Sequence, residues 1–378
     1  MSIMQLPYSD ELNIGYLSRL FDNTTNCYKF FWFMAMLRRV DHDHTRFSFD
    51  ELIDEMIADA WYMVTEYNLR LGPLGITDNL EETVKYIHNE YRFASSEKRN
   101  KILEFLRNTD DTKIKRYKST LTLNVPYRLQ VPFYDEIRIE KKDWHGPQQS
   151  LTDLINRQSH LIYYFVMISG IDTVIEIDSI WAEYFVKHRE ILKAWTQLNL
   201  IKYLQNKNPS VPGIADKIEA PSVRHIERVR DYWKLIIQVD PSIEDIYGGI
   251  HLADEKISVD HFVPWQYVAH DELWNLHPTT KTINSSKSNG LPSWTMYFDP
   301  LAELEFKAYE LKRTNTMVEN EFRKVSLYHL NNSEIKNQLY MDGLEKNEFK
   351  CRLENIIKPV YESAKMQGFK EWTYSDER

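Results

Sequence analysis

The sequence has 378 residues, 43% hydrophobic and 13% aromatic, which is enough apolar material for a large core and predicts two or three domains. No apolar run approaches the roughly 18 residues that a membrane span needs, and the first residues lack the basic and apolar regions of a signal peptide. Cys27 and Cys351 lie at opposite ends of the chain, which excludes a disulfide framework and a cysteine-based zinc site and favours the reducing cytoplasm.

The formal net charge is −9, whereas a typical nucleic-acid binder carries a basic surplus. Because affinity depends on local patches rather than on the sum, this charge does not exclude nucleic acid as a ligand. It predicts weak non-specific DNA binding at physiological salt, or help from a partner.

The N-terminal third is predicted to be helical. Asn23 to Thr25 offer N-caps for a helix to about Val40 that is apolar on every side, as a buried helix is. Ser48 and Glu51 have the spacing of a capping box, which opens a helix to about Leu71. Further helices are expected at 79–91 and 96–107.

The middle of the chain is predicted to mix extended and helical segments. In the segment 119–136, residues 120–125 alternate in polarity and Pro126 and Pro132 follow, which indicates an extended crossover. A hairpin is expected from the β-branched and aromatic runs at 162–168 and 173–178. Helices are expected at 151–158, 179–205 and 221–238, with a linker at 208–213.

The stretch 256–292 holds the residues with the most specific chemistry. A strand-like run ends on Asp260 and His261; Asn275 follows fourteen residues after His261, and Asn284 nine residues later, before a polar run that can open a helix. Asp and Asn oxygens suit one hard divalent ion such as Mg²⁺, and a neutral histidine beside them can take a proton from water. These residue types suit hydrolysis of a phosphodiester.

At these residues the chain resembles an HNH endonuclease, the ββα-metal or His-Me finger family, in its His-Asn-Asn form. The run Asn-Ser-Ser-Lys-Ser-Asn-Gly-Leu-Pro from Asn284 is similar to the HNH domain of RNA-guided CRISPR effectors. The run Asp-His-Phe-Val-Pro-Trp from Asp260 is similar to stand-alone bacterial HNH nucleases. Many relatives carry Cys-x-x-Cys in the first strand; residues 245–248 stand there instead, so no structural zinc is expected.

The resemblance implies an α+β fold that is mostly α-helical, with a small ββα-metal core embedded between helical regions. We expect a mainly helical region at 1–240 for recognition of DNA or a partner, the nuclease core at 241–298 and a helical region at 299–378. The core hairpin is expected to pair 245–251 with 256–259. Asp299 and Pro300 are expected to begin the first of two or three helices that run to about Gln367.

The resemblance also assigns roles to residues. Asp260 and Asn284 would hold one Mg²⁺ or Mn²⁺, and His261 would deprotonate the attacking water. Asn275 would tie the loop by side-chain to backbone hydrogen bonds, and Lys287 would meet a DNA phosphate or be a solvated lysine.

Four other groups of residues have simpler interpretations. Asp41 to His44 resemble a metal cluster, but a polar loop accounts for them better. The basic run from Lys113 to Lys118 is either a DNA contact or a solvated helix end. His270 to Glu272 and His277 are expected to support the site or lie at the surface.

The function implied is a metal-dependent DNA endonuclease, of the kind found in bacterial phage defence or restriction. A weaker resemblance of the helical N-terminal region and of residues 203–213 to bacterial HNH proteins points the same way. Two alternatives stay open: a nuclease subunit that needs a partner such as an ATPase, and a non-catalytic nucleic-acid-binding module.

Overall fold

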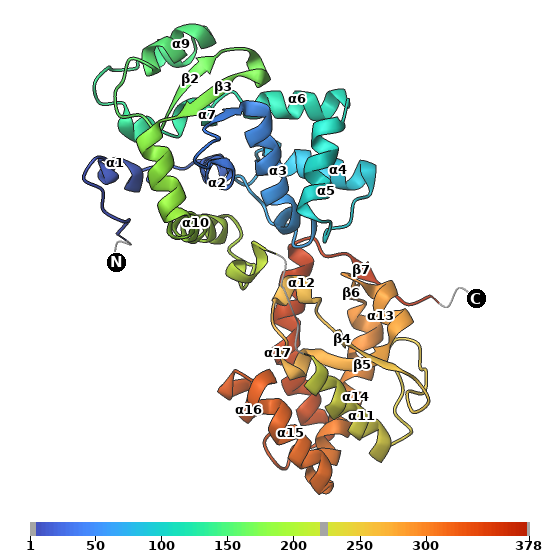
Figure 1. Cartoon of the computed structure of the whole chain (residues 1–378). Helices are drawn as coiled ribbons and strands as arrows, with labels where there is room; N and C mark the ends of the chain where they lie inside the picture. Colours follow the sequence, from blue (N-terminus) through green and yellow to red (C-terminus); the bar gives the residue numbers. More distant parts are fainter. Residues whose placement is uncertain (1–4, 220–225, 376–378) are drawn as a thin grey trace. The chain divides into compact units, whose positions relative to one another are not determined.

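The computed structural model describes residues 5–219 and 226–375, and these divide into two compact units (Figure 1). The first unit comprises the residues up to 209 together with the short segment at 218–219. The second comprises 210–217 and the residues from 226 onward. Within the described residues, no helix combines the length and apolar character that crossing a membrane requires.

The first unit is mostly helical and carries one three-stranded antiparallel sheet in the order β1-β3-β2. A register shift between Phe165 and Met167 interrupts the β2–β3 pairing. Its helices and strands are α1 (Ile14–Ser18), α2 (Tyr28–Arg39), β1 (Arg46–Ser48), α3 (Phe49–Thr65), α4 (Asn79–Tyr91), α5 (Arg99–Asn108), α6 (Thr112–Leu121), α7 (Val125–Arg128), α8 (Lys141–Trp144), α9 (Gln148–Ile155), β2 (Tyr163–Met167), β3 (Val174–Ile177) and α10 (Ser179–Lys207).

Local signals account for much of this unit. The Ser48 side chain accepts a hydrogen bond from the Glu51 amide, and the Glu51 carboxylate accepts one from the Ser48 amide, so the predicted capping box is confirmed. The predicted hairpin corresponds to β2 and β3, and residues 30–37 of α2 are all buried as expected.

Several helix boundaries and one segment of the first unit differ from the prediction. Helix α2 begins at Tyr28 rather than directly after the N-cap candidates at 23–25, and α3 ends at Thr65 rather than near Leu71. The segment 119–136 is not extended: Asp111 caps α6 by accepting from two backbone amides, and α6 continues into the segment as far as Leu121. Two short helical turns then follow.

The second unit contains the motif stretch. Its elements are α11 (Glu227–Val239), β4 (Ile257–His261), α12 (Trp265–Val268), β5 (Leu276–Thr280), α13 (Lys281–Lys287), β6 (Leu291–Pro292), α14 (Trp294–Thr314), α15 (Thr316–His329), α16 (Ser333–Leu339), α17 (Lys346–Met366) and β7 (Glu371–Trp372). Strands β4 and β5 pair antiparallel, and α13 follows β5 directly. The part of the predicted 221–238 helix before 226 lies outside the described residues.

The predicted hairpin of 245–251 with 256–259 is wrong. Only one isolated bridge, between Glu244 and His251, is found there, and the partner of β4 is β5, across the 262–275 loop. The segment before β4 instead forms a closed loop, in which the Asp245 side chain accepts hydrogen bonds from the amides of Tyr247 and Gly248 at 2.8 and 2.7 Å. These bonds close the turn at residues 245–248.

The predicted start at Asp299 and Pro300 is also wrong, because α14 begins at Trp294 and passes through Pro300. Proline has no N–H, so the carbonyl of Met296 loses its partner within the helix. The Met296 side chain is exposed, so water can reach this part of the helix.

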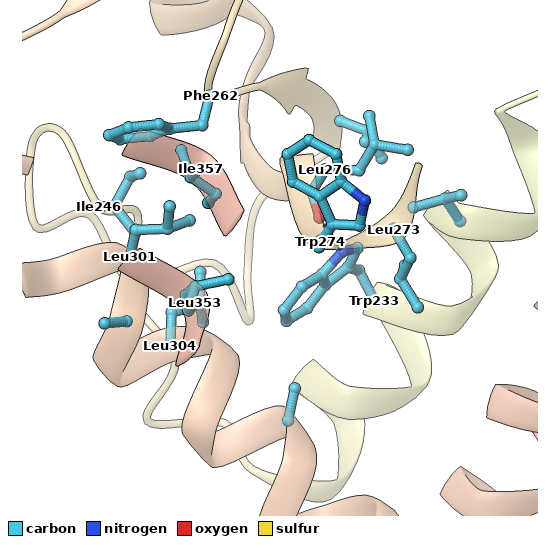
Figure 2. Close-up of a cluster of buried hydrophobic side chains, with 14 of the residues drawn as sticks. Trp233, Ile246, Phe262, Leu273, Trp274, Leu276, Leu301, Leu304, Leu353 and Ile357 are labelled. Carbon is cyan, nitrogen blue, oxygen red and sulfur yellow. Dashed lines mark hydrogen bonds between the residues drawn. The ribbon is translucent and has the colours of Figure 1, made fainter. Parts of the chain in front are cut away.

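One hydrophobic core unites the motif stretch with the helices on either side of it (Figure 2). Trp233 of α11 is fully buried, and its indole nitrogen donates to the carbonyl of Leu276 in β5 at 3.0 Å. Leu301 of α14 and Ile357 of α17 belong to the same cluster. The two strands are too short to bury a core by themselves, so these helices supply most of the apolar surface that stabilises them.

Gly290 shows how closely the end of the chain packs on the motif stretch. Strand β7 pairs in parallel with β6, and a Cβ atom at position 290 would lie 2.6 Å from that of Trp372. Only glycine fits there, which gives a structural reason for the glycine in the motif's final run.

Candidate active site

Asp260 and His261 are the last two residues of β4, and their side chains have different partners. The Asp260 carboxylate accepts a hydrogen bond from the Tyr247 hydroxyl at 2.8 Å, and the Lys287 ammonium lies 3.1 Å from its Oδ2 atom. The His261 ring instead meets Asp271, with 2.8 Å between Nε2 and Oδ1. This divergence follows from the alternation of side chains along a strand.

His261 is suited to act as a base. Its side chain is 7% exposed, and burial lowers the pKa of the ring below its ordinary value, although neighbouring Asp271 opposes the shift. The imidazole is therefore neutral at pH 7. Nδ1 of His261 makes no hydrogen bond to any of the described residues, whereas Nε2 contacts Asp271. Nδ1 is therefore the nitrogen whose lone pair can accept a proton.

Asn275 closes the loop that joins β4 to β5. Its Oδ1 accepts from the amide of Val263 at 2.8 Å and its Nδ2 donates to the carbonyl of the same residue at 2.9 Å. The backbone carbonyl of Asn275 also accepts from the Phe262 amide. The side-chain to backbone bonds expected of Asn275 are thus present, and the role of this residue is to hold the loop.

Asn284 lies on α13, with its amide group against β4. Its Nδ2 donates to the Ser258 hydroxyl at 2.8 Å and to the carbonyl of Val259 at 3.0 Å, next to Asp260 in the strand. Because the strand uses the nitrogen, the amide oxygen Oδ1 is the atom left to bind an ion.

Lys287, the last residue of α13, is buried. Its ammonium donates to Asp260 and, at 2.8 Å, to the backbone carbonyl of His261. Burial lowers the pKa of Lys287, and Asp260 opposes this shift. Lys287 is therefore not solvated: its ammonium contacts the Asp260 carboxylate and does not reach the surface.

Tyr247 and His277 complete the surroundings of Asp260. His277 was expected to support the site or lie at the surface, and it is buried beside Asp260, whereas no role was predicted for Tyr247. Burial and the nearby carboxylate raise the pKa of Tyr247, which keeps the hydroxyl protonated and able to donate. His277 is paired with Asp260 across the two strands, with 3.7 Å between its Nε2 and Oδ2 of Asp260. Burial lowers the pKa of His277 to about 3, so its ring is neutral, and neither ring nitrogen has a hydrogen-bond partner.

These residues fit a hard divalent cation. Asp260 and Asn284 offer oxygen ligands, and the ammonium of Lys287 demonstrates that the position beside Asp260 favours positive charge. In the part of the chain that the structure describes, no three His, Cys, Asp or Glu side chains are grouped as metal ligands. An ion held here would take its other ligands from water and phosphate.

Comparison with known families identifies the region around this site. Residues 245–293 match the family model of the HNH endonuclease. The HNH domain therefore contains Asp260, His261, Asn275, Asn284 and Lys287, and the HNH resemblance of the motif is confirmed at the level of this domain. Neither the curated proteins nor the solved structures that were compared gave a match.

The other candidate residues have ordinary structural partners. Asp41 accepts from the amides of Asp43 and His44 in an exposed turn, as a polar loop would. In the basic run, Lys118 is buried and forms an ion pair with Asp54. The ammonium nitrogen of Lys113 lies over the Tyr86 ring, 4.0 Å from the ring centroid. These two lysines are therefore engaged within the first unit.

Proposed function

We propose that this protein is a metal-dependent HNH endonuclease that hydrolyses DNA phosphodiester bonds. The observation that carries the proposal is His261: a buried, neutral imidazole with an unengaged Nδ1, next to Asp260 in the strand and inside the HNH domain. A general base needs this protonation state at neutral pH.

Asp260 and Asn284 would hold one Mg²⁺ or Mn²⁺, which supplies positive charge to the phosphate and to the leaving oxygen. His261 Nδ1 takes a proton from water, and the water oxygen attacks phosphorus in line with the 3′ oxygen. The bond from phosphorus to the 3′ oxygen breaks, and this oxygen takes a proton from a second water. The products then carry 5′-phosphate and 3′-hydroxyl ends. Asn275 keeps the loop closed while this happens, because both of its amide atoms bind the backbone of Val263.

Lys287 has a different role in this proposal from the phosphate contact first expected. Its ammonium neutralises the Asp260 carboxylate, and turning toward a phosphate would require it to leave a buried ion pair. Bacterial phage defence or restriction, in the cytoplasm, is the setting we propose, on the strength of the motif's similarity to stand-alone bacterial HNH nucleases.

The contact between Asp260 and Lys287 also favours a second candidate, a nuclease subunit that a partner such as an ATPase activates. In that case the partner would promote exchange of the lysine for a metal ion at Asp260. The net charge of −9 is compatible with it, because DNA binding by the chain alone would be weak.

The test is a series of plasmid and RNA cleavage reactions with Mg²⁺, Mn²⁺, Co²⁺ or EDTA. Wild type should cleave DNA with Mg²⁺ or Mn²⁺ and be inactive in EDTA. Asn284→Ala should lose activity with every ion, whereas Asn284→His should favour Mn²⁺ and Co²⁺ over Mg²⁺, because imidazole is a softer ligand than an amide oxygen. Asn289→Ala, a nearby asparagine outside the site, should behave as wild type.

Full activity of Asn284→Ala in Mg²⁺ would remove Asn284 from the metal site. Cleavage by wild type that persists in EDTA would contradict metal dependence. Absence of cleavage by the purified chain, followed by cleavage when the products of neighbouring genes are added, would select the partner-dependent candidate. Absence of cleavage in both conditions would leave the non-catalytic binding module.

A further inference from the structure

The His261 ring is held by a carboxylate that lies ten residues further along the chain. Nε2 of His261 is 2.8 Å from Oδ1 of Asp271, and the two side chains are 7% and 21% exposed. An ionised carboxylate only accepts hydrogen bonds, so the proton of the neutral ring must reside on Nε2. The contact thereby determines both the orientation of the ring and which nitrogen is free of a proton.

The position of Asp271 is in turn fixed by the end of α15. The His329 ring donates from Nδ1 to the backbone carbonyl of Asp271 at 2.7 Å. The carboxylate of the next residue, Glu272, accepts from the backbone amide of Asn331 at 3.0 Å and from its side-chain amide at 2.7 Å. His329 and Glu272 are both buried, so water competes little for these bonds.

The two adjacent acidic residues therefore have separate tasks. Glu272 anchors the loop to the segment after α15, whereas Asp271 faces the ring of His261. Residues 329–331 lie outside the matched region 245–293, so the carboxylate on the ring depends on a part of the chain that the HNH match does not include.

We propose that Asp271 is the positioning residue of the nuclease site: its carboxylate holds His261 in the form that carries its proton on Nε2 and presents the bare Nδ1 to water. This inference rests on the proposed function of His261 as general base. It also gives the C-terminal helices a part in the reaction, since His329 and Asn331 set the place of the Asp271 loop.

The test compares Asp271→Asn and Asp271→Ala with Glu272→Gln, in which the amide oxygen can still accept from Asn331. All are made in the full chain and assayed at pH 8, where the imidazole is neutral in every variant. Both Asp271 variants should lower kcat about 10²-fold, within the range measured for catalytic acid–base groups, with KM changed less than about twofold. Glu272→Gln should stay within about threefold of wild type.

Two further measurements separate positioning from a general effect on the fold. In spectra of protein labelled with ¹⁵N-histidine, His261 should carry its proton on Nε2 in wild type and Glu272→Gln, and should become a mixture of both forms in Asp271→Ala. Added formate should restore part of the cleavage by Asp271→Ala, because a small carboxylate can occupy the vacated space; loss of folding would not be corrected in this way.

Wild-type kcat in Asp271→Asn and Asp271→Ala, in an enzyme that cleaves, would overturn the role of Asp271 and leave the proposed function intact. An Nδ1-protonated His261 ring in the wild type would overturn it as well. Absence of cleavage by the wild type under every condition would overturn the proposed function, and the positioning role with it.

Discussion

Two buried lysine–aspartate pairs, one in each unit, differ in what surrounds them. In the first unit, Lys118 of α6 lies between two carboxylates of α3, with Nζ 2.8 Å from Asp50 and 2.5 Å from Asp54. In the second unit, Lys287 forms an ion pair with a single carboxylate, that of Asp260. This carboxylate also accepts a hydrogen bond from the Tyr247 hydroxyl and faces the neutral ring of His277.

In the first unit, Lys118 joins α6 to α3. The two carboxylates that it contacts are one helical turn apart on α3, so the lysine is paired on both sides. Burial raises the pKa of Asp54 to about 6, and Lys118 opposes the shift. The second pair occupies the HNH domain, where a carboxylate has one cation and an unpartnered imidazole beside it. A buried lysine–aspartate pair thus stabilises helix packing in the first unit. In the second unit, we infer that the lysine occupies the position at which a metal ion would bind Asp260.

The largest expected effect comes from replacing each lysine with methionine, which keeps much of its volume and removes its charge. Each variant should lose about 3–5 kcal/mol of local stability, because a buried carboxylate is left without its cation. Hydrogen exchange of peptides from α3 and α6, and from β4 and α13, measures the two losses separately.

The two variants should recover under different conditions. Lys118→Met should regain stability as the pH falls from 8 to 5, since the folded pKa of Asp54 is already raised and the folded state binds the proton more tightly than the unfolded state. Lys287→Met should regain stability when Mn²⁺ is added at constant pH. Equal recovery of both variants in Mn²⁺ would show that the two pairs do not differ as we infer.

A smaller effect is expected from Glu305, a buried carboxylate of α14 outside the candidate site. Burial raises the pKa of Glu305 well above its ordinary value of 4.5, and its Oε1 atom has no hydrogen-bond partner. The folded state therefore keeps a proton that the unfolded state releases, so stability falls as the pH rises above 4.5. Glu305→Gln should remove this loss, because the amide does not ionise.

Calorimetric melting temperatures between pH 5 and pH 8 test this prediction. Glu305→Gln should gain more over wild type at pH 7 than at pH 5. Glu303→Gln, at an exposed position on the same helix, is the control and should show no such trend. A gain that does not change with pH would mean that Glu305 is ionised in the folded protein.

Local signals in the sequence predicted the elements that depend on neighbouring residues. Ser48 and Glu51 form the predicted capping box, and α4 has the predicted bounds Asn79–Tyr91. Pairing across a loop was not predictable in this way: the sequence pattern pairs β4 with the run directly before it, whereas its partner β5 lies beyond a loop that Asn275 closes. The register that sets His277 against Asp260 followed from that pairing and was missed with it.

In the candidate site, too, the sequence predicts what depends on the motif itself and not what depends on long-range packing. The spacing of Asp260, His261, Asn275 and Asn284 is a property of the motif and could be recognised directly. The burial of Lys287, by contrast, depends on how α13 packs against β4, and the contact of Asp271 with His261 depends on the folded loop. The signal for Asp271 was that it is an acidic residue within the motif stretch, in a group expected to support the site or lie at the surface, and this does not distinguish it from Glu272.

The most direct test of the account is His261→Ala, with cleavage and Mn²⁺ affinity measured on the same variant. Cleavage should fall about 10²–10⁴-fold while the affinity for Mn²⁺ stays unchanged, because His261 is proposed as base and not as ligand. His251→Ala, which removes an exposed histidine from the same domain, should keep wild-type cleavage. Undiminished cleavage by His261→Ala, or loss of Mn²⁺ binding together with cleavage, would contradict the account.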